Sequence, residues 1–190
     1  WQKGRRIVTV ERENLEGPLQ EFIDELGRQD PPLVRIPGTA VFLNRGMDTA
    51  PLSMRTAVEH IHALHEHVII LSLETEPVPR VVDAERISVD NLGRPDDGII
   101  HVGARFGYME RPDVPRALRL VDPQSCEGPI DLDGASYFLS KLELVPGEHP
   151  SMAPWRTRLF IATSYITGDA AAYFGLPQDR TVIIGSRLQV

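Results

Sequence analysis

The sequence predicts an α/β fold in which a mixed sheet of about six strands, starting with a β-α-β unit, is flanked by helices. Two short apolar runs, 39–44 and 68–73, have the β-branched and aromatic content of buried strands. Residues 51–67 between them have a helical pattern, so the two strands should lie parallel in one sheet. Residues 86–92 then alternate apolar and polar side chains ahead of a turn, which predicts a hairpin.

The first part of the chain, 1–37, is expected to form an arm ahead of an α/β domain at 38–190. Within the arm, residues 15–26 are predicted to form an amphipathic helix that ends at Gly27. Its apolar side chains recur at helical spacing: Leu15, Leu19, Phe22, Ile23 and Leu26. Three prolines make residues 29–37 an expected extended connector.

The remaining elements follow the same alternation of helices and strands. The second strand of the hairpin is expected at 99–106, a short helix at 113–121 and a further strand at 136–145. A long amphipathic helix at 151–175 follows, and 181–184 with 187–190 make one apolar closing strand. Ser151 is the expected N-cap of the long helix and Gly175 its C-cap, and Gly185 is the expected bend in the closing strand.

Composition narrows the class of protein. The chain has 190 residues, of which 42% are hydrophobic, and this fits one compact domain. A net charge of −7 argues against nucleic-acid binding, which needs a basic surface. Cys126 is the single cysteine, so an internal disulfide is excluded and a reducing compartment is favoured. No run approaches the roughly 20 apolar residues of a membrane helix, so we expect a soluble cytosolic domain.

The N-terminal residues have an unusual composition. Trp1 is followed closely by Lys3, Arg5 and Arg6. An aromatic residue beside clustered basic residues is typical of the cytoplasmic edge of a membrane helix. A solvated N-terminal arm explains the same residues, and the pattern alone favours that simpler interpretation.

A group of histidines offers the one metal-like pattern in the sequence. It consists of His60, His62, His65 and His67 with Glu59 and Glu66. On the predicted helix, His62 would share a face with His65 and Glu66 only, so the ligand set would be partial. We therefore predict polar helix-face histidines, no metal and no cofactor, with a metal-dependent enzyme kept as a hypothesis from another class.

Catalytic and nucleotide-binding patterns are weak. Cys126 lies in a loop with nothing to activate it, and no nucleophile motif of the hydrolase type occurs. The pairs Asp96 with Asp97 and Asp131 with Asp133 are best explained as turn residues. The loops 44–49 and 74–80 should follow the first two strands, at the edge where α/β sheets bind ligands, but neither has a phosphate-binding motif. We predict no catalytic residue and leave cofactor-binding residues unassigned.

Several strings resemble a known family. Arg35-Ile-Pro-Gly-Thr-Ala-Val-Phe-Leu43 is similar to the segment that opens the conserved soluble part of KUP potassium transporters, and His65-Glu66 resembles the His-Glu that precedes the second strand there. The similarity continues through five further segments: Glu74 to Val82, Arg105 to Glu110, Ser136 to Ser140, Trp155-Arg156 and Tyr173 to Pro177. It covers nearly the whole chain, although Tyr108 and residues 120–133 depart from the family pattern.

The resemblance implies a role for the fragment. It suggests the C-terminal cytoplasmic domain of a membrane protein that takes up potassium, with protons, across the plasma membrane. The basic residues at the N-terminus then resemble the segment that leaves the last membrane helix. The implied partners are the membrane part of the same transporter and a second copy of the domain. A cytosolic nucleotide or cyclic dinucleotide is the alternative ligand, which would make the domain a sensor.

Overall fold

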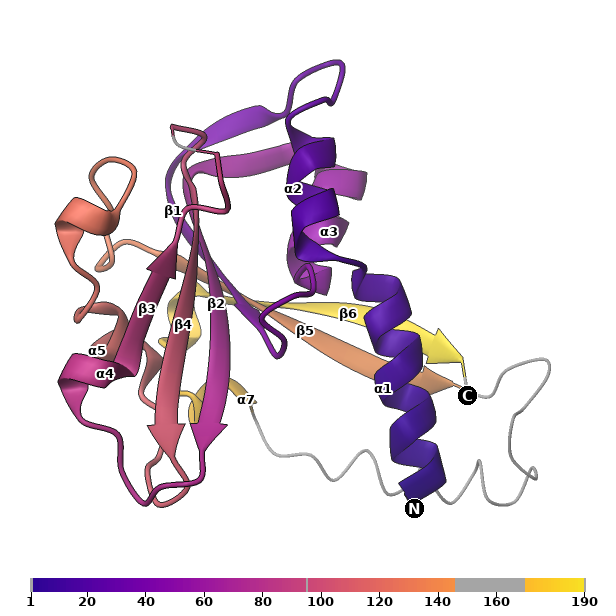
Figure 1. The fold of residues 1–190 in the computed structure, drawn as a ribbon. Coiled ribbons are helices and arrows are strands. Elements are labelled where there is room, and N and C mark those ends of the chain that lie inside the picture. Colours follow the sequence, from indigo (N-terminus) through magenta and orange to yellow (C-terminus); the bar gives the residue numbers. More distant parts are fainter. Residues whose placement is uncertain (1, 95, 146–169, 190) are drawn as a thin grey trace.

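The central feature of the structure is a six-stranded mixed sheet with helices on both faces (Figure 1). The computed structural model describes residues 2–94, 96–145 and 170–189. The strands lie in the order β3-β4-β2-β1-β5-β6. Their bounds are β1 Val34–Asn44, β2 Ala63–Glu76, β3 Ile87–Asp90, β4 Ile99–Gly107, β5 Ser136–Val145 and β6 Thr181–Gln189. The predicted α/β class is confirmed.

The strand pairing confirms both predicted supersecondary units. β1 is parallel to β2, as a β-α-β unit requires, and β3 is antiparallel to β4, as a hairpin requires. The pairs β2–β4, β1–β5 and β5–β6 are also parallel. β3 is therefore the one strand of the sheet that runs against the others, and β1, β2 and β4 end at the same edge.

Neighbouring residues of the central strands enter two different cores. Val41 and Leu43 face a core that includes α5 (Val114–Leu118) and α7 (Ala170–Tyr173). Ala40 and Phe42 face a second core that includes α2 (Leu19–Leu26) and α3 (Leu52–Thr56). Because both faces are covered, these strands are apolar at successive positions. Each large side chain buried in this way stabilises the fold by about 1.5–3 kcal/mol.

The predicted helix at 51–67 is much shorter in the structure. α3 covers Leu52–Thr56 and continues as a π-helix, Ala57–Ile61, which ends at His62 with a left-handed φ of 54°. β2 then starts at Ala63, five residues before the predicted strand at 68–73. The reason is tertiary: Leu64 is 1% exposed, and this part of β2 pairs with the start of β1, which satisfies its backbone groups.

The predicted connector at 29–37 also changes at its end. β1 begins at Val34, so residues 34–37 belong to a strand. The pairing with β2 shifts between Ile36 and Thr39, and Pro37 lies in this irregularity, where its missing N–H costs the ladder least. Gly38 follows with a φ of 109°, a conformation that glycine adopts without strain.

The N-terminal region contains two helices in place of one. α1 runs over Gln2–Glu16, and Gly17, with a φ of 65°, separates it from α2. Leu15 therefore belongs to α1 and is 45% exposed, so its assignment to the buried stripe was wrong. Leu19, Phe22 and Ile23 are buried as predicted. Gly27 is the C-cap of α2, also as predicted.

The C-terminal elements are partly described. The predicted helix at 151–175 lies outside the described residues except for its last turn, α7, which Gly175 follows with a φ of 65°. The predicted closing strand is confirmed as β6, which is continuous through Gly185, where the glycine pairs with Lys141. The short helices not yet named are α4 Asp83–Arg86, η2 Pro123–Ser125 and η3 Gln178–Arg180. Within the described ranges, no helix has the length and apolarity to cross a membrane.

Candidate functional site

The loop after β1, at the edge where α/β sheets bind ligands, is folded onto its own strand end. The Asn44 side-chain amide donates to the carbonyl of Gly46 at 2.9 Å and to that of Thr49, and its Oδ1 accepts from the Arg45 N–H at 3.0 Å. Ser72, on β2, donates from its hydroxyl to the same Gly46 carbonyl at 2.6 Å. The polar groups that could meet a ligand here are thus used to hold the loop.

A buried histidine completes this arrangement. His101, on β4, is 5% exposed, and its Nε2 lies 2.9 Å from the Ser72 hydroxyl oxygen. Since the single hydroxyl hydrogen of Ser72 is given to Gly46, Nε2 carries the proton and donates to Ser72. Burial lowers the pKa of His101, against the nearby carboxylates of Asp90, Asp48 and Glu74, so the ring is neutral at pH 7.

The loop after β2 is held by a clamp that the sequence did not reveal. Glu110, which follows β4, accepts hydrogen bonds from the Val81 N–H at 3.0 Å and the Gly107 N–H at 2.6 Å. Its carboxylate also pairs with Arg86 Nη2 at 2.7 Å. The Arg86 hydrogen bond, followed by those from the two backbone groups, lowers the pKa of Glu110 to about 2. The family-like string at 105–110 was the available signal, since it contains the glutamate.

The histidines do not form a metal site. His65 and His67 lie on β2, His62 lies at its start and His60 lies in the π-helix, so the helix face predicted for His62, His65 and Glu66 does not exist. In the part of the chain that the structure describes, no group of three or more His, Cys, Asp or Glu could hold a metal ion. Burial lowers the pKa of His65, which therefore stays neutral in its half-buried position.

The other candidates have structural surroundings. Burial raises the pKa of the Cys126 thiol, so the thiolate is scarce at pH 7. Asp97 Oδ1 accepts from the Ile99 N–H at 2.8 Å. Asp131 Oδ1 accepts from the N–H groups of Asp133 and Gly134, at 3.1 and 3.0 Å. Asp97 and Asp131 therefore have the turn-forming roles that the sequence predicts.

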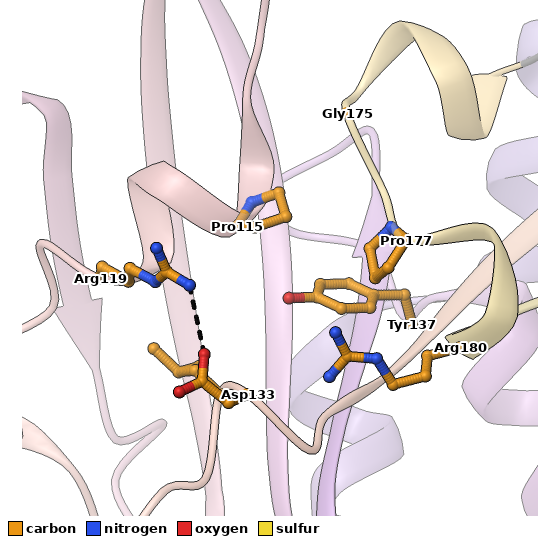
Figure 2. A pocket seen from close by; sticks show the side chains of 8 residues that line it. Pro115, Arg119, Asp133, Tyr137, Gly175, Pro177 and Arg180 are labelled. Atoms are coloured by element: carbon orange, nitrogen blue, oxygen red, sulfur yellow. Dashed lines mark hydrogen bonds and ion pairs between the residues drawn. The ribbon is translucent and has the colours of Figure 1, made fainter.

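A small hollow lies elsewhere, between α5, β5 and η3 (Figure 2). It has a volume of about 160 Å³, and its lining residues are Pro115, Arg119, Leu132, Asp133, Tyr137, Gly175, Pro177 and Arg180. The Tyr137 ring is 2% exposed, and its hydroxyl points into the hollow, toward the space between Pro115 and Asp133 (Figure 2). No local motif marks this site in the sequence, because its residues are spread over 115–180.

The charged groups of the hollow form ion pairs. Arg119 pairs with Asp133 at 3.2 Å, and Arg180, whose guanidinium lies beside the Tyr137 ring, pairs with Asp179 at 3.8 Å (Figure 2). Burial raises the pKa of the Tyr137 hydroxyl, which is therefore a neutral hydrogen-bond donor. Two guanidinium groups and one hydroxyl can donate hydrogen bonds to a phosphate or carboxylate group, and each guanidinium already has one carboxylate partner.

The comparisons with known proteins identify the family. A family model described as "K+ potassium transporter C-terminal domain" matches residues 37–190. The chain belongs to this family. A relative from Rhodococcus jostii (strain RHA1), described as "Probable potassium transport system protein Kup", is 62% identical over 190 residues, which are 100% of this chain and 29% of the relative. The resemblance seen in the sequence is thereby confirmed.

More distant relatives carry the same description. This K+ transporter C-terminal domain is 38% identical to the protein from Anaeromyxobacter sp. (strain Fw109-5) over 193 residues, covering 100% of this chain and 28% of the relative. It is 35% identical to the protein from Cutibacterium acnes (strain DSM 16379 / KPA171202) over 188 residues, covering 97% of this chain and 29% of the relative. The chain therefore spans less than a third of the length of these relatives. No solved structure matches it significantly.

Proposed function

We propose that this K+ transporter C-terminal domain is a cytoplasmic docking and regulatory module, without enzymatic activity, of a proton-coupled potassium uptake protein. The observation that carries the proposal is the family match over residues 37–190. The structure supports it because the polar clusters of the described residues hold loops and strand ends together. Residues 1–37 are proposed to link the domain to the membrane part, with α1 as the connection.

Deletion of the domain tests the proposal. In the full-length transporter, removal of residues 37–190 should reduce potassium uptake or the abundance of the protein in the membrane. Rubidium uptake, quantitative immunoblotting of membranes and oligomer mass in detergent should be measured together. If uptake, abundance and oligomeric state all match the intact transporter, the docking and regulatory role is contradicted.

Pairing with a second copy is part of the proposal. β6 is an edge of the sheet, and its Val182 and Ile183 are 45% and 54% exposed. An exposed apolar edge strand can pair with another copy of itself. Ile183→Lys should then shift the chain toward the monomer in analytical ultracentrifugation, whereas an unchanged sedimentation profile would contradict pairing at this edge.

A second candidate function is a sensor for an anionic cytosolic ligand. The hollow at Tyr137, with Arg119 and Arg180, favours it. Its volume of about 160 Å³ suits a phosphate group, so a nucleotide or cyclic dinucleotide would place only a phosphate there. Calorimetry should show binding that Arg180→Ala removes. Neither heat nor a thermal shift with any nucleotide tested would exclude this function.

A further inference from the structure

The loops after β2 and β4 expose apolar side chains side by side. Val78 is 42% exposed, Tyr108 60% and Met109 68%. The Tyr108 N–H donates to the Val78 carbonyl at 2.9 Å, and the Met109 N–H donates to the Pro79 carbonyl at 3.2 Å. The two loops are thus joined through their backbones. We call Val78, Tyr108 and Met109 the apolar tip.

The apolar tip has rigid support. The Glu110 carboxylate accepts from the N–H groups of Val81, in the loop after β2, and Gly107, the last residue of β4. Arg86 pairs with that carboxylate at 2.7 Å. Arg86 itself is 8% exposed, and its guanidinium lies 5.1 Å from the centre of the Phe106 ring. The three side chains of the apolar tip expose apolar surface to water and do not contribute to either core. A group of exposed apolar side chains on a rigid backbone is typical of a surface that binds a partner.

Exposed arginines flank the apolar tip, although the whole chain is acidic. Of the acidic groups nearby, Glu74 and Glu76 share Arg105 at 3.6 and 3.8 Å, Glu110 pairs with Arg86 at 2.7 Å, and Asp113 accepts from the Arg116 N–H at 3.0 Å. Arg80 is exposed, and Arg111 is exposed although it donates one bond to the Ala172 carbonyl. Tyrosine, methionine and flanking arginines are the composition of a surface that enters a lipid interface.

The direction of α1 also favours a contact between the apolar tip and the membrane. The loops that follow β2 and β4 lie at the end of the molecule where α1 has its N-terminal end (Figure 1). A C-terminal domain is preceded in its protein by the rest of the transporter, so α1 leads back toward the membrane part. The apolar tip therefore faces the same side as the connection to the membrane.

We propose that the apolar tip, flanked by Arg80 and Arg111, inserts into the headgroup region of the bilayer beside the transporter. This inference rests on the proposed function, because it requires the domain to lie under the membrane part. The Tyr108 and Met109 side chains enter the apolar edge of the headgroup region, and the two guanidinium groups bind lipid phosphates. The contact fixes the domain at a second point in addition to α1.

The test uses the full-length transporter in nanodiscs of phosphatidylcholine and phosphatidylglycerol. With the native cysteines replaced, a nitroxide label is attached through Met109→Cys and, in a second variant, Val78→Cys. Both residues are exposed, so the labels leave the core intact. The matched control is Arg28→Cys, an exposed position two residues after α2. The C-terminal end of α2 lies at the opposite end of the molecule from the start of α1 (Figure 1).

Power saturation with oxygen and with a water-soluble nickel chelate reports where each label lies. At positions 109 and 78 we expect oxygen accessibility to exceed nickel accessibility, and at position 28 the reverse. Labels at 109 and 78 that behave like the control lie in water and overturn the inference. Labels shielded from both reagents lie against protein and overturn it as well.

The two proposals fail separately. Uptake that survives deletion of residues 37–190, together with a lipid signal at position 109, leaves the membrane contact standing and contradicts the regulatory role. Uptake that is lost on deletion, together with a water signal at position 109, leaves the regulatory role standing and contradicts the membrane contact.

Discussion

At the scale of single residues, charged groups in this domain hold loops in place. The Glu110 carboxylate accepts hydrogen bonds from two backbone N–H groups and pairs with one guanidinium group. Asn44 and Ser72 hold the loop at the end of β1 in the same way, through hydrogen bonds from neutral side chains. In each case a polar side chain satisfies backbone groups that the end of a strand leaves open.

Glu110→Gln should destabilise the domain by about 2 kcal/mol at pH 7, because charge-assisted hydrogen bonds are among the strong ones. The pKa of Glu110 falls from 4.5 to about 2 on folding, so its stabilisation is complete above pH 4.5. It is lost as the pH falls through about 2.

Urea unfolding of both proteins from pH 7 to pH 2 measures this contribution. The difference between wild type and Glu110→Gln should shrink below about pH 4. A difference that stays constant over the whole range would show that the charge of Glu110 is not what holds the loops.

Ser72→Ala should cost about 1–3 kcal/mol, since it leaves the His101 Nε2–H and the Gly46 carbonyl without their buried partner. Ser88→Ala, at an exposed position on β3, is the control and should change stability by less than about 0.5 kcal/mol. Denaturant midpoints of the two variants compare them directly. Equal midpoints would mean that the Ser72 hydroxyl is replaced by water at no cost.

At the scale of elements, the ends of helices and strands are set by contacts with distant segments. α1 stops at Glu16, whose carbonyl accepts from Arg55 Nε and Nη2 at 3.1 and 2.9 Å, and Gly17 then turns the chain. The Leu19 N–H at the start of α2 donates to the Asp48 carbonyl at 2.8 Å. The junction of the two helices is therefore built from groups on α3 and on the loop after β1.

Gly17→Ala should destabilise the domain more than Gly93→Ala does. Both glycines have left-handed backbones, with φ values of 65° and 71°, so both variants carry about 1 kcal/mol of strain. At Gly17 an added Cβ would also lie 3.0 Å from Arg55 Nη2, whereas at Gly93 it would meet nothing within 4 Å.

Thermal unfolding of the two glycine variants tests this comparison. The extra loss in Gly17→Ala should come from the displaced Arg55 bonds to Glu16. Equal losses in the two variants would show that Arg55 moves aside freely, and that the backbone strain alone accounts for the cost.

At the scale of the whole molecule, the sheet separates two cores, and β3 and β6 are its edge strands among the described residues. Phe42 is 1% exposed and stacks on Phe138 with ring centres 4.7 Å apart, which joins β1 to β5 on the α2 side. The α5 side has its own set of buried residues. The parallel strands of this mixed sheet need both layers, because they are apolar on both faces.

Phe42→Ala should cost about 3–5 kcal/mol, the usual range for removing a buried aromatic ring. Val82→Ala is the control, because Val82 is 61% exposed and its loss should be within about 0.5 kcal/mol. Equilibrium unfolding in urea measures both. A loss below about 1 kcal/mol in Phe42→Ala would show that the core beside α2 relaxes into the space.

The sequence by itself determined the α/β class, the parallel pairing of β1 with β2, the hairpin and the family. Local patterns carry this information, since buried strands are apolar runs and a β-α-β unit has one strand direction. Only the tertiary structure decided that residues 63–67 are strand. The pairing of these residues with β1 outweighs their helical pattern. The periodicity of a segment carries no information about a partner strand elsewhere in the chain.

The same limit applies to the sites. The loop clamp at Glu110 and the hollow at Tyr137 bring together residues separated by up to 65 positions, as from Pro115 to Arg180. Their distances depend on how the sheet is ordered and how its edges are covered, which no local spacing encodes. The sequence named the transporter family, and the three-dimensional arrangement decided which residues meet at the loop ends.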